Sequence, residues 1–137
     1  MAGDFHFTLK NQLSDLAPLA EQVRTAVADL GLTERDFFCI DLVCDELITN
    51  TIKYGYDDTK EHEIGVHVSV QPTEIVIELK DDGHPFNPLE SATPDTNLAM
   101  QERPIGGLGI HLLREMMDRC EYRHTDGKNC VTFQKSR

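Results

Sequence analysis

Apolar residues recur at every second position in three stretches of the chain, 5–9, 64–70 and 75–79. This period of two is typical of strands that bury one face. Pro72 and Thr73 separate the second and third stretches, so we expect those two strands to form an antiparallel hairpin. A second hairpin, 120–133, is predicted around the turn dipeptide Asp126-Gly127.

Spacings of three and four between apolar residues predict helices elsewhere. One helix is expected to begin at Ser14 as its N-cap, and a second to run from a capping-box pattern at Thr33 to about Tyr54. A third is expected after the glycines at 106–109. The stretch 87–105 is the longest irregular segment and contains three prolines, which is typical of a lid, a binding loop or a disordered segment.

The order of these elements predicts an α+β fold. We expect a two-layer α/β sandwich, with helices on one face of a mixed, mainly antiparallel sheet. The 137 residues suffice for one hydrophobic core, so a single domain over 1–137 is expected. Regular βαβ units and a Gly-x-x-x-x-Gly-Lys-Ser/Thr motif are absent from the sequence, which disfavours Rossmann and P-loop domains.

Charge and composition narrow the function classes. The 24 acidic and 13 basic residues give a net charge of −11, which disfavours a nucleic-acid partner but not a small phosphate ligand. The sequence has neither a run of about 20 apolar residues for a membrane span nor a signal-peptide pattern. The four cysteines form no Cys-x-x-Cys pair, so we expect reduced thiols in a cytoplasmic protein without structural zinc.

Two glycine-containing motifs carry candidate chemistry. Gly106-Gly107-Leu108-Gly109 at a helix N-terminus could hold a phosphate, with Arg103 as a second contact, or could form only a tight entry turn. Asp81-Asp-Gly83 ends a predicted strand. Its first carboxylate could accept a hydrogen bond from an exocyclic amine, or the motif could be a plain Asp-Gly turn.

A polar stripe on the second helix is the third candidate. Glu46, Asn50 and Lys53 follow one another at helical spacing. A carboxylate, a neutral oxygen ligand and an ammonium group suit a metal–phosphate ligand, because Mg²⁺ takes few protein ligands and is often completed by substrate phosphates. The alternative is an ordinary solvated helix face.

Together the three motifs resemble the N, G1 and G2 boxes of the Bergerat-fold ATP-binding superfamily, in the same order. The residues are Glu46-Leu-Ile-Thr-Asn50, Asp81-Asp-Gly83 and Gly107-Leu-Gly109, and the loop between the last two resembles an ATP lid. Asp45-Glu46, Lys53-Tyr-Gly-Tyr56 and the stretch 81–88 look most like the anti-sigma-factor serine/threonine kinases of that superfamily.

The resemblance implies ATP and Mg²⁺ as cofactors and gives roles to matching residues. Glu46 would be the general base for hydroxyl attack, and Asn50 would bind both the nucleotide and the metal ion. Asp81, with Gly83 beside it, would hold the adenine amine. The remaining nucleotide contacts implied are Lys53, Arg103, Gly107, Leu108, Gly109 and Thr132.

The function implied by the resemblance is a kinase that phosphorylates an anti-sigma-factor antagonist, with a sigma factor as its other partner. A homodimer is left open. Two rival hypotheses remain: an ATP-binding module that sequesters a regulatory protein with little or no kinase activity, and a stand-alone ATPase. Glu46 favours the enzyme, since a pure binding module needs no general base.

Overall fold

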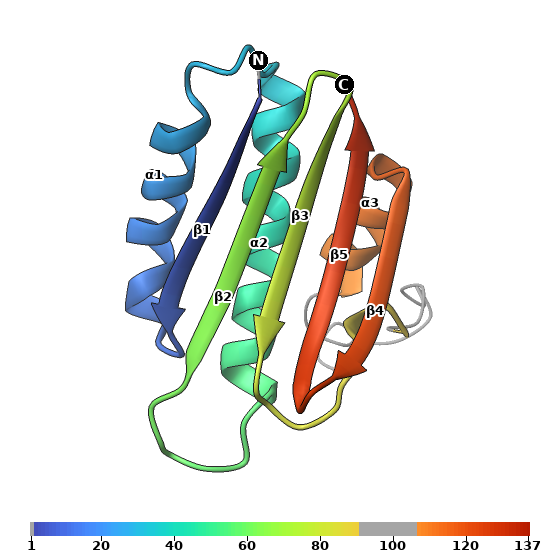
Figure 1. Ribbon diagram of the computed structural model, residues 1–137. Helices are drawn as coiled ribbons and strands as arrows, with labels where there is room; N and C mark the ends of the chain where they lie inside the picture. Colours follow the sequence, from blue (N-terminus) through green and yellow to red (C-terminus); the bar gives the residue numbers. More distant parts are fainter. Residues whose placement is uncertain (1, 91–106) are drawn as a thin grey trace.

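The computed structural model describes residues 2–90 and 107–137 and has the expected α+β architecture, with helices on one face of a sheet (Figure 1). The expected lid, 87–105, lies mostly outside the described residues. The elements are, in chain order, β1 (Gly3–Lys10), η1 (Leu13–Asp15), α1 (Leu16–Val27), α2 (Glu34–Tyr54), β2 (Glu63–Val70), β3 (Glu74–Asp81), η2 (Pro88–Glu90), α3 (Gly107–Met116), β4 (Arg119–Thr125) and β5 (Lys128–Ser136).

The five strands form one sheet in the order β1-β2-β3-β5-β4. Every pairing among these described strands is antiparallel, so the mixed sheet expected from the sequence is not what the described part of the chain forms. Strand β5 is inserted between β3 and β4, and its register sets Asp81 opposite Asn129. The end of β3 and the start of β5 are therefore neighbours.

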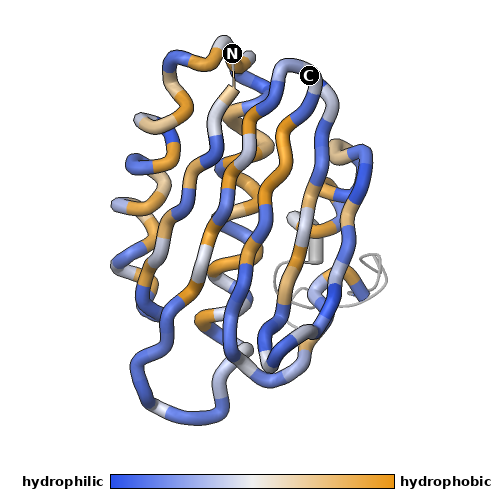
Figure 2. The backbone as a smooth tube through the Cα atoms, viewed as in Figure 1, coloured by the Kyte–Doolittle hydropathy of each residue, from blue (hydrophilic) through white to orange (hydrophobic). Residues whose placement is uncertain are grey.

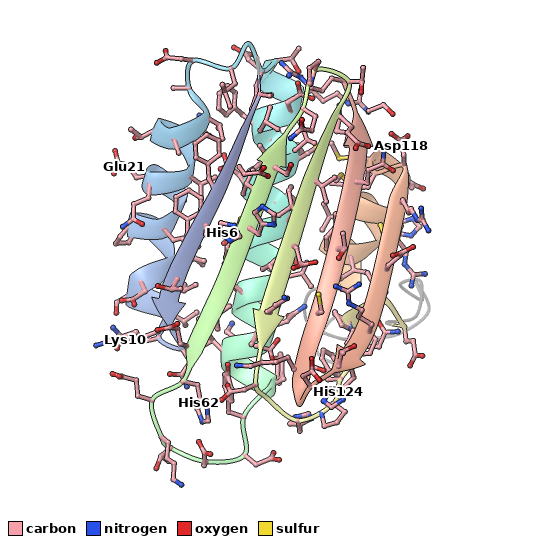
Figure 3. All side chains as sticks on the ribbon, in the orientation of Figure 1. His6, Lys10, Glu21, His62, Asp118 and His124 are labelled. Carbon is pink, nitrogen blue, oxygen red and sulfur yellow. The ribbon has the colours of Figure 1, made fainter. Side chains whose placement is uncertain are left out.

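Buried apolar residues alternate with more exposed polar residues along β2 and β3, so one face of the sheet packs against the helices and the other is open. Figure 2 shows the matching alternation of hydrophobic and hydrophilic residues along the strands. Helix α2 packs behind the centre of the sheet (Figure 1). His6 lies on the open face, where its ring stacks on His67 at 4.1 Å (Figure 3). The largest fully buried side chains include Phe133, Leu19, Ile40, Ile48, Ile64, Ile75, Ile77, Ile110 and Leu113.

The N-terminus of α2 has the expected capping box. The Asp36 N–H donates to Thr33 Oγ1, and the Thr33 N–H donates to the Asp36 carboxylate, both at 3.1 Å. Asp36, only 3% exposed, also pairs with Lys135 Nζ at 2.8 Å. The expected Ser14 cap of α1 is wrong, because a 3₁₀ turn occupies Leu13–Asp15 and Asp15 is the N-cap residue.

The last hairpin also agrees with its prediction. Asp126 and Gly127 form its turn with φ values of 55° and 73°, a conformation that Gly and Asp tolerate best. All four cysteines are free, as expected. Within the described residues, no helix combines the length and the apolar character that crossing a membrane requires.

Candidate functional site

A pocket lies where α2 and β3 end and β5 begins, with about 380 Å³ of empty space open to solvent. Small-molecule sites often combine apolar walls with a few polar groups in this way. Figure 3 labels His62 and His124 at this end of the sheet. The pocket is lined by Leu47, Asn50, Thr51, Gly55, Leu79, Asp81, His84, Phe86, Pro88, Asn129 and Val131.

Asp81 is the buried carboxylate of this pocket, at 9% exposure. Its Oδ1 accepts hydrogen bonds from the Gly83 N–H at 2.9 Å and from Asn129 Nδ2 at 3.0 Å. Its Oδ2 accepts no hydrogen bond from the described part of the chain. This oxygen can therefore accept a hydrogen bond from a ligand.

Gly83 brings two backbones into close contact. A Cβ at this position would overlap the Gly55 carbonyl oxygen and lie 3.1 Å from the Gly55 carbonyl carbon. The same carbonyl accepts a hydrogen bond from the His84 N–H at 2.9 Å, so the end of α2 is tied to the exit of β3. The His84 ring also donates to the Tyr54 carbonyl oxygen at 2.7 Å, and this hydrogen bond raises the pKa of the imidazole.

Asn50 enters the pocket from α2. It is only 7% exposed, and its side chain makes no hydrogen bond to another described residue. A polar side chain that lines a pocket and has no protein partner can hydrogen-bond to water or to a ligand. Asn50 therefore offers a free oxygen at the edge of the same pocket that contains Asp81.

Glu46 lies one helical turn before Asn50 and packs against the first turn of α3. A Cβ added to Gly109 would overlap the carboxyl group of Glu46, so only a glycine leaves room for this carboxylate. Burial, assisted by the negative charge of Asp45, raises the pKa of Glu46. The α2–α3 junction thus holds a half-buried carboxylate beside a helix N-terminus.

The structure brings together only part of the expected site. Asn50, Asp81 and Gly83 meet at the pocket, and Glu46 meets Gly109 at the neighbouring helix junction. Gly107 and Leu108 open α3. Lys53 is exposed and is absent from the pocket lining, while Arg103 falls outside the described residues.

Thr132 is not at the pocket. It lies on the open face of the sheet, where its hydroxyl donates to Glu78 Oε2 at 3.4 Å. Side chains alternate along a strand, so Val131 and Asn129 point into the pocket and Thr132 points away from it. The structure therefore does not bring Thr132 to the pocket that contains Asp81.

Asn129, His84 and Phe86 line the pocket but were not singled out from the sequence. His84 and Phe86 closely follow the Asp81-Asp-Gly83 motif, so their adjacency to it is a local sequence signal for the pocket. Asn129 had no such signal, because its contact with Asp81 depends on the pairing of β3 with β5.

Comparison with protein-family models settles the family. The model of the histidine kinase-like ATPase domain matches residues 9–135, which is nearly all of the chain. The chain belongs to this family. For this histidine kinase-like ATPase domain, the match implies that ATP is the nucleotide used.

Several named proteins are similar to this ATPase domain. Serine/threonine-protein kinase BtrW of Bordetella bronchiseptica is 26% identical over 98 residues, which are 70% of this chain and 68% of that protein. An anti-sigma F factor of Oceanobacillus iheyensis is 27% identical over 121 residues, 82% of this chain and 83% of that protein. Serine-protein kinase RsbW of Halalkalibacterium halodurans is 29% identical over 102 residues, covering 72% and 62% of the two chains.

A solved structure agrees on the fold. The RsbU and RsbW domains of Rv1364c from Mycobacterium tuberculosis align with a TM-score of 0.65 at 15% identity, over 98% of this chain and 33% of that one. The resemblance to the anti-sigma-factor kinases and the expected Bergerat-type fold are thus confirmed.

Proposed function

We propose that this chain is an ATP-dependent serine/threonine protein kinase that transfers the γ-phosphate of ATP to a partner protein. The observation that carries the proposal is the Glu46 carboxylate, half-buried against Gly109 and one helical turn from the pocket residue Asn50. The pocket gives the nucleotide a place to bind, and Glu46 gives the reaction a base. The kinase names of BtrW and RsbW support the same activity.

The residues of the pocket fit an adenine nucleotide. The open Asp81 Oδ2 would accept a hydrogen bond from the exocyclic amine of the base, and the apolar side chains of Leu79 and Val131 would pack against the ring. Gly83 lets the backbone lie close behind that carboxylate. The first turn of α3, beginning at Gly107, would direct N–H groups at the phosphates.

Asn50 would bind Mg²⁺ through its free amide oxygen. No group of three or more His, Cys, Asp or Glu side chains within 2–90 and 107–137 could hold a metal ion by itself. This fits an ion that takes one or two protein ligands and is completed by phosphates and water. When bound, Mg²⁺ would neutralise charge on the transferring phosphate.

Glu46 would act as the general base. Its carboxylate takes the proton of a Ser or Thr hydroxyl as the hydroxyl oxygen attacks the γ-phosphorus, and the bond to the β-phosphate oxygen breaks to release ADP. The raised pKa makes Glu46 a stronger base than a fully solvated glutamate. Catalysis would otherwise consist of positioning and charge stabilisation.

The proposed substrate is an anti-sigma-factor antagonist, and the proposed second partner is a sigma factor. This proposal rests on the similarity to proteins named anti-sigma F factor and RsbW. The net charge of −11 favours partners that present a basic surface. Such partners are transcription regulators, so we also propose that the chain is cytoplasmic and binds neither membranes nor nucleic acids.

A phosphotransfer assay tests the proposal. Purified chain is mixed with Mg²⁺, γ-labelled ATP and a candidate antagonist, and the expected result is label on a Ser or Thr of the antagonist. Label that appears only as free phosphate would make the chain an ATPase. Label that stays in ATP while a sigma factor co-elutes with the chain would make it a binding module, and either result would overturn the kinase proposal.

Gly109→Ala is expected to show whether Gly109 mainly makes room for the Glu46 carboxylate or mainly binds the phosphates. The new Cβ would displace the Glu46 carboxylate, which is a flexible side chain, so stability should change little. We expect phosphotransfer to fall about tenfold or more, because a misplaced base loses much of its effect, with ADP affinity unchanged in a calorimetric titration. Lost ADP affinity with an unchanged rate would instead assign Gly109 to phosphate binding.

A further inference from the structure

We propose that Asn129 is a positioning residue that leaves one oxygen of Asp81 for the ligand and so makes the pocket select a base with an amino group over one with a carbonyl group. This inference rests on the proposed nucleotide site. Asn129 lies outside the N, G1 and G2 boxes and acts through the hydrogen bonds of its amide.

The amide nitrogen of Asn129 is surrounded by acceptors. Nδ2 donates to Asp81 Oδ1 at 3.0 Å, to the His84 carbonyl oxygen at 2.9 Å and, at the longer distance of 3.3 Å, to the Gly83 carbonyl oxygen. Asn129 is only 4% exposed, so water does not replace these contacts easily. Both hydrogens of the NH₂ group are therefore in use.

The amide oxygen of Asn129 is surrounded by donors. Oδ1 accepts from the Phe86 N–H at 3.2 Å and from the Tyr122 hydroxyl at 2.5 Å. The opposite orientation of the amide would set its oxygen against Asp81 and two carbonyl oxygens, and would set its NH₂ group against the Phe86 N–H. The network therefore permits one orientation of Asn129.

This orientation determines what Asp81 can offer. Its Oδ1 is occupied by two donors, the Gly83 N–H and the Asn129 NH₂ group, which prevent the carboxylate from turning. The ligand meets Oδ2, which is an acceptor without a partner in the described part of the chain. An amino group on the base completes this arrangement, whereas a carbonyl oxygen at the same place would face an oxygen.

Asn129 also holds the wall of the pocket in place. Its amide contacts the backbone of three residues in the segment that follows β3, Gly83, His84 and Phe86. Two of these, His84 and Phe86, line the pocket. One side chain of β5 thus fixes both the recognition carboxylate and the wall beside it.

The test measures discrimination between ADP and inosine diphosphate, which has a 6-oxo group in place of the 6-amino group. Calorimetric titrations of the wild-type chain are expected to show tighter binding of ADP. In Asn129→Ala, ADP binding should weaken about tenfold and inosine diphosphate binding should change less than about twofold, since only the amino group uses the positioned oxygen. The ratio of the two Kd values should therefore fall about tenfold.

Asn11→Ala is the matched control. Asn11 also joins distant segments through its amide, by contacts with His62 and Lys60, but it is not at the pocket. The ratio of the two Kd values in Asn11→Ala should equal that of the wild-type chain. If the ratio falls as far in Asn11→Ala as in Asn129→Ala, loss of any such long-range amide contact lowers the discrimination, and the inference is overturned. An unchanged ratio in folded Asn129→Ala would also overturn it.

Tyr122→Phe provides a milder variant should Asn129→Ala not fold. It removes the hydroxyl that braces Asn129 Oδ1 and keeps the ring. A reduced Kd ratio in this variant supports the inference, and an unchanged ratio overturns it. A wild-type chain that binds no ADP would overturn the proposed function itself, whereas discrimination that survives without Asn129 would overturn only its positioning role.

Discussion

Glu46→Gln is expected to lower phosphotransfer by about 10²–10⁴-fold, the usual contribution of a general base. The amide has nearly the same shape as the carboxylate, so it keeps the packing against Gly109 but cannot accept the proton. ADP affinity should be unchanged or slightly higher, because a negative charge near the phosphates is removed. Single-turnover transfer and ADP titration measure the two quantities separately.

The pH dependence of Glu46→Gln gives a second check. In the wild-type chain, phosphotransfer should fall as the pH decreases through the raised pKa of Glu46, and Glu46→Gln should lack this decrease. Burial raises the pKa of Glu46 in the folded state. The fold therefore loses stability as the pH rises from the ordinary pKa of a glutamate through this raised pKa, because Glu46 ionises. Glu46→Gln should therefore be at least as stable as the wild-type chain at neutral pH, and full transfer activity in this variant would remove Glu46 from the mechanism.

Gly83→Ala is expected to destabilise the fold and to weaken nucleotide binding together. Its methyl group would overlap the Gly55 carbonyl oxygen and lie 3.0 Å from Asp81 Oδ1. The first of these is a backbone atom, so the end of α2 and the exit of β3 must separate, at a cost on the order of 1–3 kcal/mol. Thermal unfolding and ADP titration should both record the loss.

Gly65→Ala is the control for this substitution. Gly65 lies in β2 of the same sheet, where an added Cβ would have only the Lys80 carbonyl oxygen nearby, at 4.0 Å. Thermal stability and ADP affinity should stay close to those of the wild-type chain. If Gly83→Ala behaves like Gly65→Ala, the contact between Gly55 and Gly83 does not shape the pocket.

Features with a local cause could be predicted from the sequence. The capping box at Thr33 sets the start of α2, and helical spacing on that helix then relates Glu46 to Asn50. The Asp81-Asp-Gly83 motif ends a strand whose alternation is plain. Each of these predictions needed only a few neighbouring residues.

Features that depend on distant pairing could not be predicted in the same way. Asn129 meets Asp81 across 48 positions of sequence, because β5 pairs with β3. Thr132 is the opposite case, because its residue type suits a nucleotide site but its side chain lies on the face of β5 away from the pocket. The local pattern of apolar residues identifies a strand. Which of its residues reaches a site depends on the face of the sheet to which each side chain points and on the strand that pairs with it.

The ion pair of Asp36 and Lys135 has a consequence for the distant site. It joins the start of α2 to the end of β5 across 99 positions of sequence, while the opposite ends of the same two elements carry Asn50 and Asn129. From Asp36 to Asn50 the helix rises about 21 Å. Over that length a tilt of about 3° displaces Asn50 by about 1 Å, a shift large enough to impair catalysis. Substitutions around Asp36 and Lys135 could therefore tune the turnover rate from the far end of the molecule, while every residue that touches the nucleotide stays the same.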